Sequence, residues 1–147
     1  MIRGMVWLFA LGIACAPGPQ GTTAGNEAAS AAAEALERAR ACADDLDRAG
    51  TSDVEAVARA LPVEPVRIAP YRGTPLEGAA VRREVAARLD AARADAAAAR
   101  SLASVAEVGS VRLAEERAIR AIRIADELCR AASSLPSERL ARRRTGP

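Results

Sequence analysis

Residues 26–50 read NEAASAAAEALERARACADDLDRAG, and they carry the clearest structural pattern of the 147-residue chain. Small or apolar residues recur in this stretch at alternating steps of four and three: Ala28, Ala32, Ala35, Ala39, Cys42, Leu46 and Ala49. This spacing is typical of a coiled-coil helix that buries one face. Asn26 can cap such a helix at its start and Gly50 can end it, so the stretch predicts one long helix.

A short helix and an irregular connector are expected next. Ser52-Asp53-Val54-Glu55 has the pattern of a capping box, and Pro62 would end the helix that follows. The apolar face of this helix consists of Val54, Val57, Ala58 and Leu61. Residues 62–75 then hold four prolines, which predict an irregular segment. Its apolar side chains, expected to lie on the bundle, are Val63, Val66, Ile68 and Tyr71.

Two further long helices are predicted over residues 76–108 and 110–135. Thr74-Pro75-Leu76-Glu77 is a strong start signal, with Thr as the cap, Pro at the first helical position and Glu at the third. Gly109-Ser110 is the only break signal before Pro136. Without that break, residues 76–135 would form a single rod of roughly 90 Å, and a coiled-coil dimer becomes the expectation.

Each of these two helices carries an expected buried stripe. On the first the stripe is Val81, Val85, Leu89, Ala92, Ala96, Ala99, Ala103 and Ala106. On the second it is Ala118, Ile122, Ala125, Cys129 and Ala132, flanked by Ile119, Ile124, Leu128 and Leu135. The predicted fold is therefore all-α, an Ala-rich antiparallel helical bundle or long helical hairpin over residues 26–135, with three long helices and one short one.

Alanine supplies 38 residues, so helices can approach closely while each contact buries little area. Covalent help is then valuable, and Cys42 and Cys129 both lie on expected buried stripes. If the long helices run up, down and up, Cys42 lies roughly 12 Å below the top and Cys129 roughly 9 Å below the same top. These matching levels favour a disulfide between them. Two buried free thiols, or cysteines that pair between chains, are the alternatives.

The N-terminus has the pattern of an export signal. Arg3 precedes an apolar run from Met5 to Ala16, which as a helix would span roughly 18 Å. That length is too short for a hydrocarbon core of roughly 30 Å but suits the apolar region of a signal peptide. Residues 1–14 are therefore interpreted as a signal peptide, and the Gly- and Pro-rich residues 15–25 as a flexible tether.

Gly12-Ile13-Ala14-Cys15 resembles the lipobox of bacterial lipoproteins, with Ala14 and Cys15 as the matching positions. The resemblance implies that Cys15 is acylated and becomes the mature N-terminus, so that the protein is anchored in the cell envelope and faces the periplasm. Ala14-Cys15-Ala16 also fits an ordinary signal-peptidase site, which would yield a secreted protein without lipid. Pro17 would then follow the cut, and proline makes a poor scissile bond.

The absences in the composition bear on function. The chain has no His, and all 21 basic residues are Arg, so imidazole catalysis, Schiff-base chemistry and a phosphate-loop lysine are excluded. Acidic and basic residues are interspersed and the net charge is +2. The chain therefore has no net electrostatic field that would attract nucleic acid. We therefore expect no catalytic residues and no cofactor. Residues 136–147, with Arg142, Arg143 and Arg144, are expected to form a solvated basic tail.

Two groups of charged residues were weighed as sites. Acids beside the two cysteines would gather at one level if the disulfide forms, and these acids are Asp44, Asp45, Asp47, Asp126 and Glu127. A helix lacks the carbonyl ligands of a Ca²⁺ loop, so solvated flanks are expected in place of a metal site. A second group is expected to form an exposed ion-pair face on the last helix, and consists of Glu115, Glu116, Arg117, Arg120 and Arg123.

The functional expectation is a non-enzymatic envelope lipoprotein, a helical scaffold or binding module. Its membrane contact would be the lipid anchor, and its protein partner would dock on an exposed apolar stripe of the third or fourth helix. The alternative is a soluble secreted binding or inhibitor-like protein with the same fold and no lipid.

Overall fold

The computed structural model describes residues 23–51, 53–61, 67–105 and 107–135. Within these ranges the chain is helical and contains no strand, which confirms the all-α prediction of three long helices and one short one. The elements are α1 (Thr23–Gly50), α2 (Val54–Ala60), the 3-10 helix η1 (Ala69–Tyr71), α3 (Glu77–Ala103) and α4 (Val108–Ser133). The predicted signal peptide, residues 15–22 of the tether and the basic tail lie outside the described residues.

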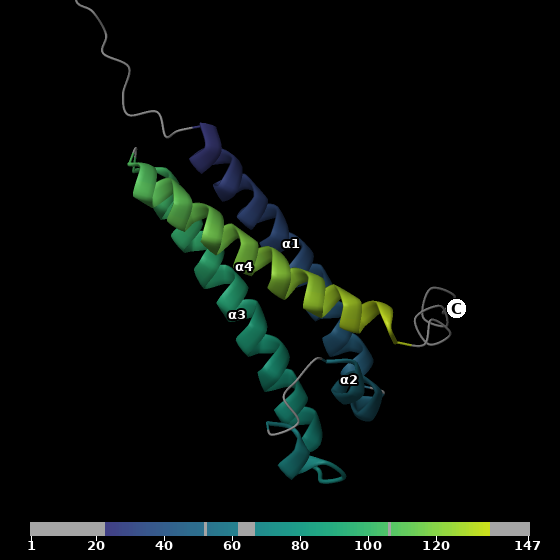
Figure 1. Ribbon diagram of the computed structural model, residues 1–147. Helices are drawn as coiled ribbons and strands as arrows, with labels where there is room; N and C mark the ends of the chain where they lie inside the picture. The colour runs from purple at the N-terminus through teal and green to yellow at the C-terminus, as the bar shows by residue number, and fades with distance from the viewer. Residues whose placement is uncertain (1–22, 52, 62–66, 106, 136–147) are drawn as a thin grey trace, which may run out of the picture.

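The three long helices pack side by side, and α2 lies at the end of the bundle where α1 finishes (Figure 1). Contacts show their directions. Cys42 is joined to Cys129 and Arg38 pairs with Asp126, so α1 and α4 run parallel. Arg88 pairs with Glu127 whereas Asp95 pairs with Arg117, so α3 runs antiparallel to α4. The up, down, up order is confirmed, and the single rod over residues 76–135 is excluded.

Alanine dominates the core, as the composition predicts. The only large side chains that are fully buried in the described residues are Leu46, Leu128 and Val57. Of the expected α1 stripe, Ala28, Ala32, Ala35, Ala39 and Leu46 are buried, while Cys42 and Ala49 are half-buried against them. On α3 the expected residues Val81, Val85, Ala92, Ala96, Ala99 and Ala103 are buried. The heptad-like spacing therefore identified the faces of α1 and α3 correctly.

On α4 the expected stripe is rotated. The buried residues are Ala114, Ala118, Ala121, Ala125, Leu128 and Ala131. Ile122, expected at the centre, is only partly buried at the edge of the core, and Ile119 is 64% exposed. The reason is steric: alanine faces on α1 and α3 bring the helix axes close together, so α4 turns its own alanines inward and its isoleucines to the edge.

Helix boundaries differ from the predictions at two starts. α1 begins at Thr23, so Asn26 lies inside the helix and residues 23–25 of the expected tether are helical. α2 is capped by Asp53 in place of Ser52, because the Asp53 carboxylate accepts a hydrogen bond of 3.1 Å from the backbone N–H of Ala56. The capping chemistry is the predicted one, moved by one residue.

The predicted start of α3 is formed as a turn that precedes the helix. Thr74 Oγ1 accepts from the N–H of Leu76 at 3.3 Å, and Glu77 Oε2 accepts from the N–H of Gly73 at 2.9 Å. Gly73 has a φ of 71°, a conformation that favours glycine. The α-helix itself begins at Glu77. In the connector Ile68 is buried and Tyr71 half-buried, as expected, whereas Val63 and Val66 lie outside the described residues.

The break between α3 and α4 falls earlier than predicted. α3 ends at Ala103 and α4 begins at Val108, so Gly109 and Ser110 belong to the first turn of α4. The Ser104 hydroxyl donates to the carbonyl of Ser101 at 2.6 Å, which satisfies a carbonyl that the ending helix would leave unpaired. A serine that terminates a helix through its own side chain is a weaker signal than glycine, which explains the displaced prediction.

Candidate functional site

A disulfide joins Cys42 on α1 to Cys129 on α4, with the two Cα atoms 4.9 Å apart. Both cysteines are half-buried, at the edge of the core. The bridge confirms the prediction from matching helix levels. The structure therefore excludes the alternatives of two free thiols and of pairing between chains.

Ion pairs connect the long helices around this bridge. Arg38 Nη2 lies 3.0 Å from Asp126 Oδ1, which links α1 to α4 on the side where the disulfide lies. Arg88 Nη1 lies 2.6 Å from Glu127 Oε2, which links α3 to α4. Arg88 also reaches Glu84 one turn earlier on its own helix. The two interhelical pairs, Arg38–Asp126 and Arg88–Glu127, fix the helices in one register because each joins residues far apart in the chain.

Asp95 on α3 is the one buried charged side chain among the described residues. Its Oδ1 atom lies 2.9 Å from Arg117 Nη1 and 3.9 Å from Arg120 Nε, both on α4. The expected ion-pair face on α4 is therefore wrong for these two arginines, which pair with α3. Within α4 the structure has one pair of this kind, Arg112 with Glu116 at 3.4 Å. Sequence reasoning missed Asp95 because its partners depend on where the α3–α4 turn lies.

Three of the five acids beside the cysteines pair with arginine. Asp126 pairs with Arg38, Glu127 with Arg88, and Asp45 with Arg48. In the part of the chain that the structure describes, no group of three or more potential ligands is placed to hold a metal ion.

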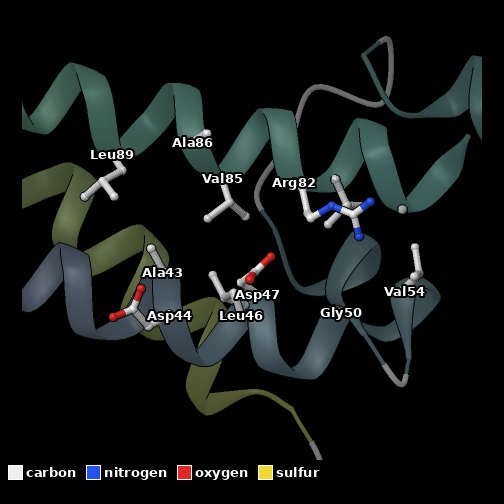
Figure 2. A pocket seen from close by; sticks show the side chains of 12 residues that line it. Ala43, Asp44, Leu46, Asp47, Gly50, Val54, Arg82, Val85, Ala86 and Leu89 are labelled. Atoms are coloured by element: carbon white, nitrogen blue, oxygen red, sulfur yellow. The ribbon is translucent and has the colours of Figure 1, made fainter.

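A groove of about 180 Å³ runs between α1 and α3 beside α2 (Figure 2). Its residues are Ala43, Asp44, Leu46, Asp47, Gly50, Val54, Gly78, Val81, Arg82, Val85, Ala86 and Leu89. Most of these residues are apolar or small. The groove is open because its glycine and alanine residues have little or no side chain to fill it. Figure 2 shows Asp47 extending from α1 toward α3, and Arg82 extending from α3 with its guanidinium above Gly50.

The charges of the groove suit binding more than catalysis. Asp44, Asp47 and Arg82 have no hydrogen bond or ion pair with any other residue that the structure describes. Carboxylates facing a guanidinium over an apolar floor can hold a polar or zwitterionic group.

Exposed apolar side chains lie at the α3–α4 turn and along α4. The exposed fractions are 41% for Val105, 88% for Val108, 48% for Leu113 and 64% for Ile119. Helical geometry puts Val108 and Ile119 on one side of α4, with Arg112 and Glu115 between them, and Leu113 on another side. The apolar residues of α4 therefore do not form the continuous docking stripe that was expected.

No helix within the described ranges combines the length and the apolar character needed to cross a membrane. No protein-family model, curated protein or solved structure matches the chain.

Proposed function

We propose that the protein is a non-enzymatic cell-envelope lipoprotein, anchored through acylated Cys15, whose helical bundle is a scaffold or binding module. The observation that carries the proposal is the disulfide between Cys42 and Cys129. Disulfides persist in oxidising compartments such as the periplasm and are rare where thiols are kept reduced. The disulfide therefore supports export, the same outcome that the apolar N-terminal run and the lipobox-like Gly12–Cys15 predict.

Binding is the activity that the bundle supports best. The chain has no His and no Lys, and the α1–α3 groove presents carboxylates and a guanidinium that pair with no other described residue, beside apolar side chains. A protein or peptide segment with complementary charges would find both apolar area and polar anchors there. The bundle is also held rigid by the disulfide and the interhelical ion pairs, which suits a scaffold that presents a surface.

A secreted protein with the same bundle and no lipid is the second candidate. Ala14-Cys15-Ala16 is the specific observation in its favour, because this sequence fits an ordinary signal-peptidase site. The disulfide supports this candidate equally.

Mass spectrometry of the full chain expressed in a bacterial host separates these proposals. A mature protein that begins at Cys15 and carries a diacylglyceryl group supports the lipoprotein, and a Cys15→Ala variant should lack that mass. A mature protein without lipid that begins after Ala16 supports the secreted alternative. An intact chain that still begins at Met1 in the cytosol, with Cys42 and Cys129 as free thiols, would contradict both.

A further inference from the structure

The start of α1 and the turn between α3 and α4 lie at the same end of the bundle (Figure 1). The disulfide links residues 87 positions apart and the Arg38–Asp126 pair links residues 88 apart. Carried back along the two parallel helices, the same offset brings Thr23 level with Ser110 and Val111 in the first turn of α4. An anchor on the chain just before Thr23 would therefore also keep the α3–α4 turn close to that anchor.

This turn carries one apolar side chain that is almost fully exposed and a second that is partly exposed. Val108 is 88% exposed, the highest value among the large apolar residues of the described chain, and Val105 on the other side of the turn is 41% exposed. The valines share the turn with the exposed Glu107, whereas the long sides of the bundle carry exposed charged residues along their length, such as Glu34, Arg93 and Arg123 on α1, α3 and α4. Moving those charges into an apolar layer is unfavourable, whereas moving the valines there is favourable.

The length of the chain between Cys15 and Thr23 limits how far this end can lie from the anchor. Eight residue steps reach at most about 29 Å even when fully extended. α3, with 27 residues, puts its own start roughly 40 Å from the turn. If Cys15 is acylated, the α3–α4 turn is the end of the bundle that the anchor keeps at the bilayer.

The charges closest to the turn cancel each other. Glu27 and Glu107 are exposed at this end, and so are Arg100 and Arg112. A contact with lipid would therefore depend on apolar burial and not on attraction to anionic headgroups. Zwitterionic phospholipid is accordingly the right probe, and salt should have little effect.

From these observations we infer that the α3–α4 turn is a membrane-contacting site, where Val105 and Val108 enter the interfacial layer of a phospholipid bilayer. The inference rests on the proposed acylation of Cys15 and adds an orientation: the bundle stands upright on the membrane, with the α1–α3 groove and α2 at the far end. Two valines alone bury too little area to hold a protein on a bilayer, so the contact depends on the anchor.

Tryptophan fluorescence tests this inference. The single Trp of the chain is Trp7, which precedes Cys15, so a tryptophan introduced into the mature protein reports alone. Val108→Trp, in lipidated protein on phosphatidylcholine vesicles with brominated acyl chains, should show blue-shifted emission. Its intensity should fall about twofold relative to unbrominated vesicles, because interfacial side chains lie within roughly 5–10 Å of the acyl boundary. Val105→Trp should respond in the same direction.

Leu76→Trp is the matched control, because Leu76 is a 58% exposed apolar residue at the opposite end of α3. Its emission should not respond to the brominated lipid. Equal quenching at both ends would mean that the bundle lies flat, and an unquenched Trp at position 108 would mean that the turn stays in water. Either result overturns the inference.

The mass of the same samples separates the two proposals. A diacylglyceryl group on Cys15 together with an unquenched Trp at position 108 leaves the lipoprotein standing and removes only the orientation. The absence of lipid on Cys15 removes the lipoprotein and the orientation that rests on it. Val108→Trp expressed without residues 1–14, so that Cys15 stays unacylated and Trp7 is absent, should not respond to vesicles, and a full response there would contradict the dependence on the anchor.

Discussion

Asp95 is the residue where the fold places a charge inside an otherwise alanine-rich core. It is 8% exposed and pairs with Arg117 and Arg120 on the neighbouring helix. Its partners are about two-fifths exposed, so water screens the pair from one side. The carboxylate therefore acts as a polar tie between α3 and α4 and not as an isolated buried charge.

Neutralising Asp95 should destabilise the protein moderately. Asp95→Asn removes the charge-assisted acceptor of Arg117, and we expect the free energy of unfolding to fall by about 1–2 kcal/mol. Urea unfolding followed by far-UV circular dichroism measures the change. Asp90→Asn is the matched control on the same helix, since Asp90 is 68% exposed and pairs with Arg93 within one turn. The control should stay within about 0.5 kcal/mol, and equal losses would contradict the tie.

At the scale of single residues, the cysteine pair could be predicted and Asp95 could not. Cys42 and Cys129 were paired from their distances to helix ends, and those distances tolerate errors of a residue or two. The partner of Asp95 depends on the rotation of α4 and on the position of the turn, which lies between Asp95 and Arg117, residues 22 apart in the chain. Both of these were predicted with small errors, and small errors change which side chains meet.

At the scale of helices, the packing depends on how small the facing residues are. Ala92 on α3 is fully buried, whereas Ala91 beside it is exposed. Ala92→Leu inserts a side chain where the helix axes are close, and we expect a loss of about 1–3 kcal/mol of stability from overpacking. Ala91→Leu should change stability by less than about 0.5 kcal/mol, because the two residues have similar helix propensity and the site is solvated. Thermal and urea unfolding measure both. A stabilised Ala92→Leu variant would show that the helices are not closely packed there.

The fold-back of α3 onto α4 predicts an energetic coupling between Arg88 and Glu127. In a continuous rod these residues, 39 apart, would be separated by roughly 58 Å, whereas the structure has them in contact. A double-mutant cycle with Arg88→Ala and Glu127→Ala should give a coupling energy of about 0.5 kcal/mol or more. Arg88 also pairs with Glu84 on its own helix. The cycle subtracts the energy of that pair, because Arg88→Ala removes it both with and without Glu127.

Asp126 provides the control for this cycle, because it neighbours Glu127 but pairs with Arg38 on α1. Arg88→Ala combined with Asp126→Ala should be additive within about 0.3–0.5 kcal/mol. Zero coupling between Arg88 and Glu127 would contradict the antiparallel arrangement.

Strict periodicity explains which helical faces could be predicted. The α1 stripe alternates four and three without interruption, and the structure buries it as expected. α4 offers two competing faces, one rich in isoleucine and one in alanine, and hydrophobicity alone favours the isoleucines. The structure selects the alanines because the partner helices have already set a close spacing. Which face of α4 is buried depends on the packing of all three helices, and the sequence of α4 alone does not determine it.

At the scale of the whole molecule, the disulfide closes most of the chain into one loop. A loop between residues 87 apart gives about 4.5 kcal/mol in the chain-entropy account, and typical measured losses are about 2–5 kcal/mol. We expect a Cys42→Ser, Cys129→Ser double variant to lose stability in this range. Reducing agent should lower the urea midpoint of the parent protein to nearly the same value. The double variant should be insensitive to the reductant, and a parent protein that is equally insensitive would contradict the structure.

The groove shows where prediction from sequence ends at this scale. Asp47 and Arg82 are 35 positions apart, and neither belongs to a motif. They line one groove only because α1 and α3 pack side by side with glycine and alanine among the lining residues. The register of three helices must be known before such a pair can be recognised.

The parallel course of α1 and α4 sets the order in which the molecule can be completed. A chain that emerges N-terminus first, from a ribosome or through a translocation pore, exposes Cys42 before Cys129 has emerged. The early hairpin of α1 and α3 must wait with one flank open until the last helix arrives. Because that flank is mostly alanine, it exposes little apolar surface to other chains. The thiol of Cys42 then forms its disulfide with Cys129 in the last step of folding.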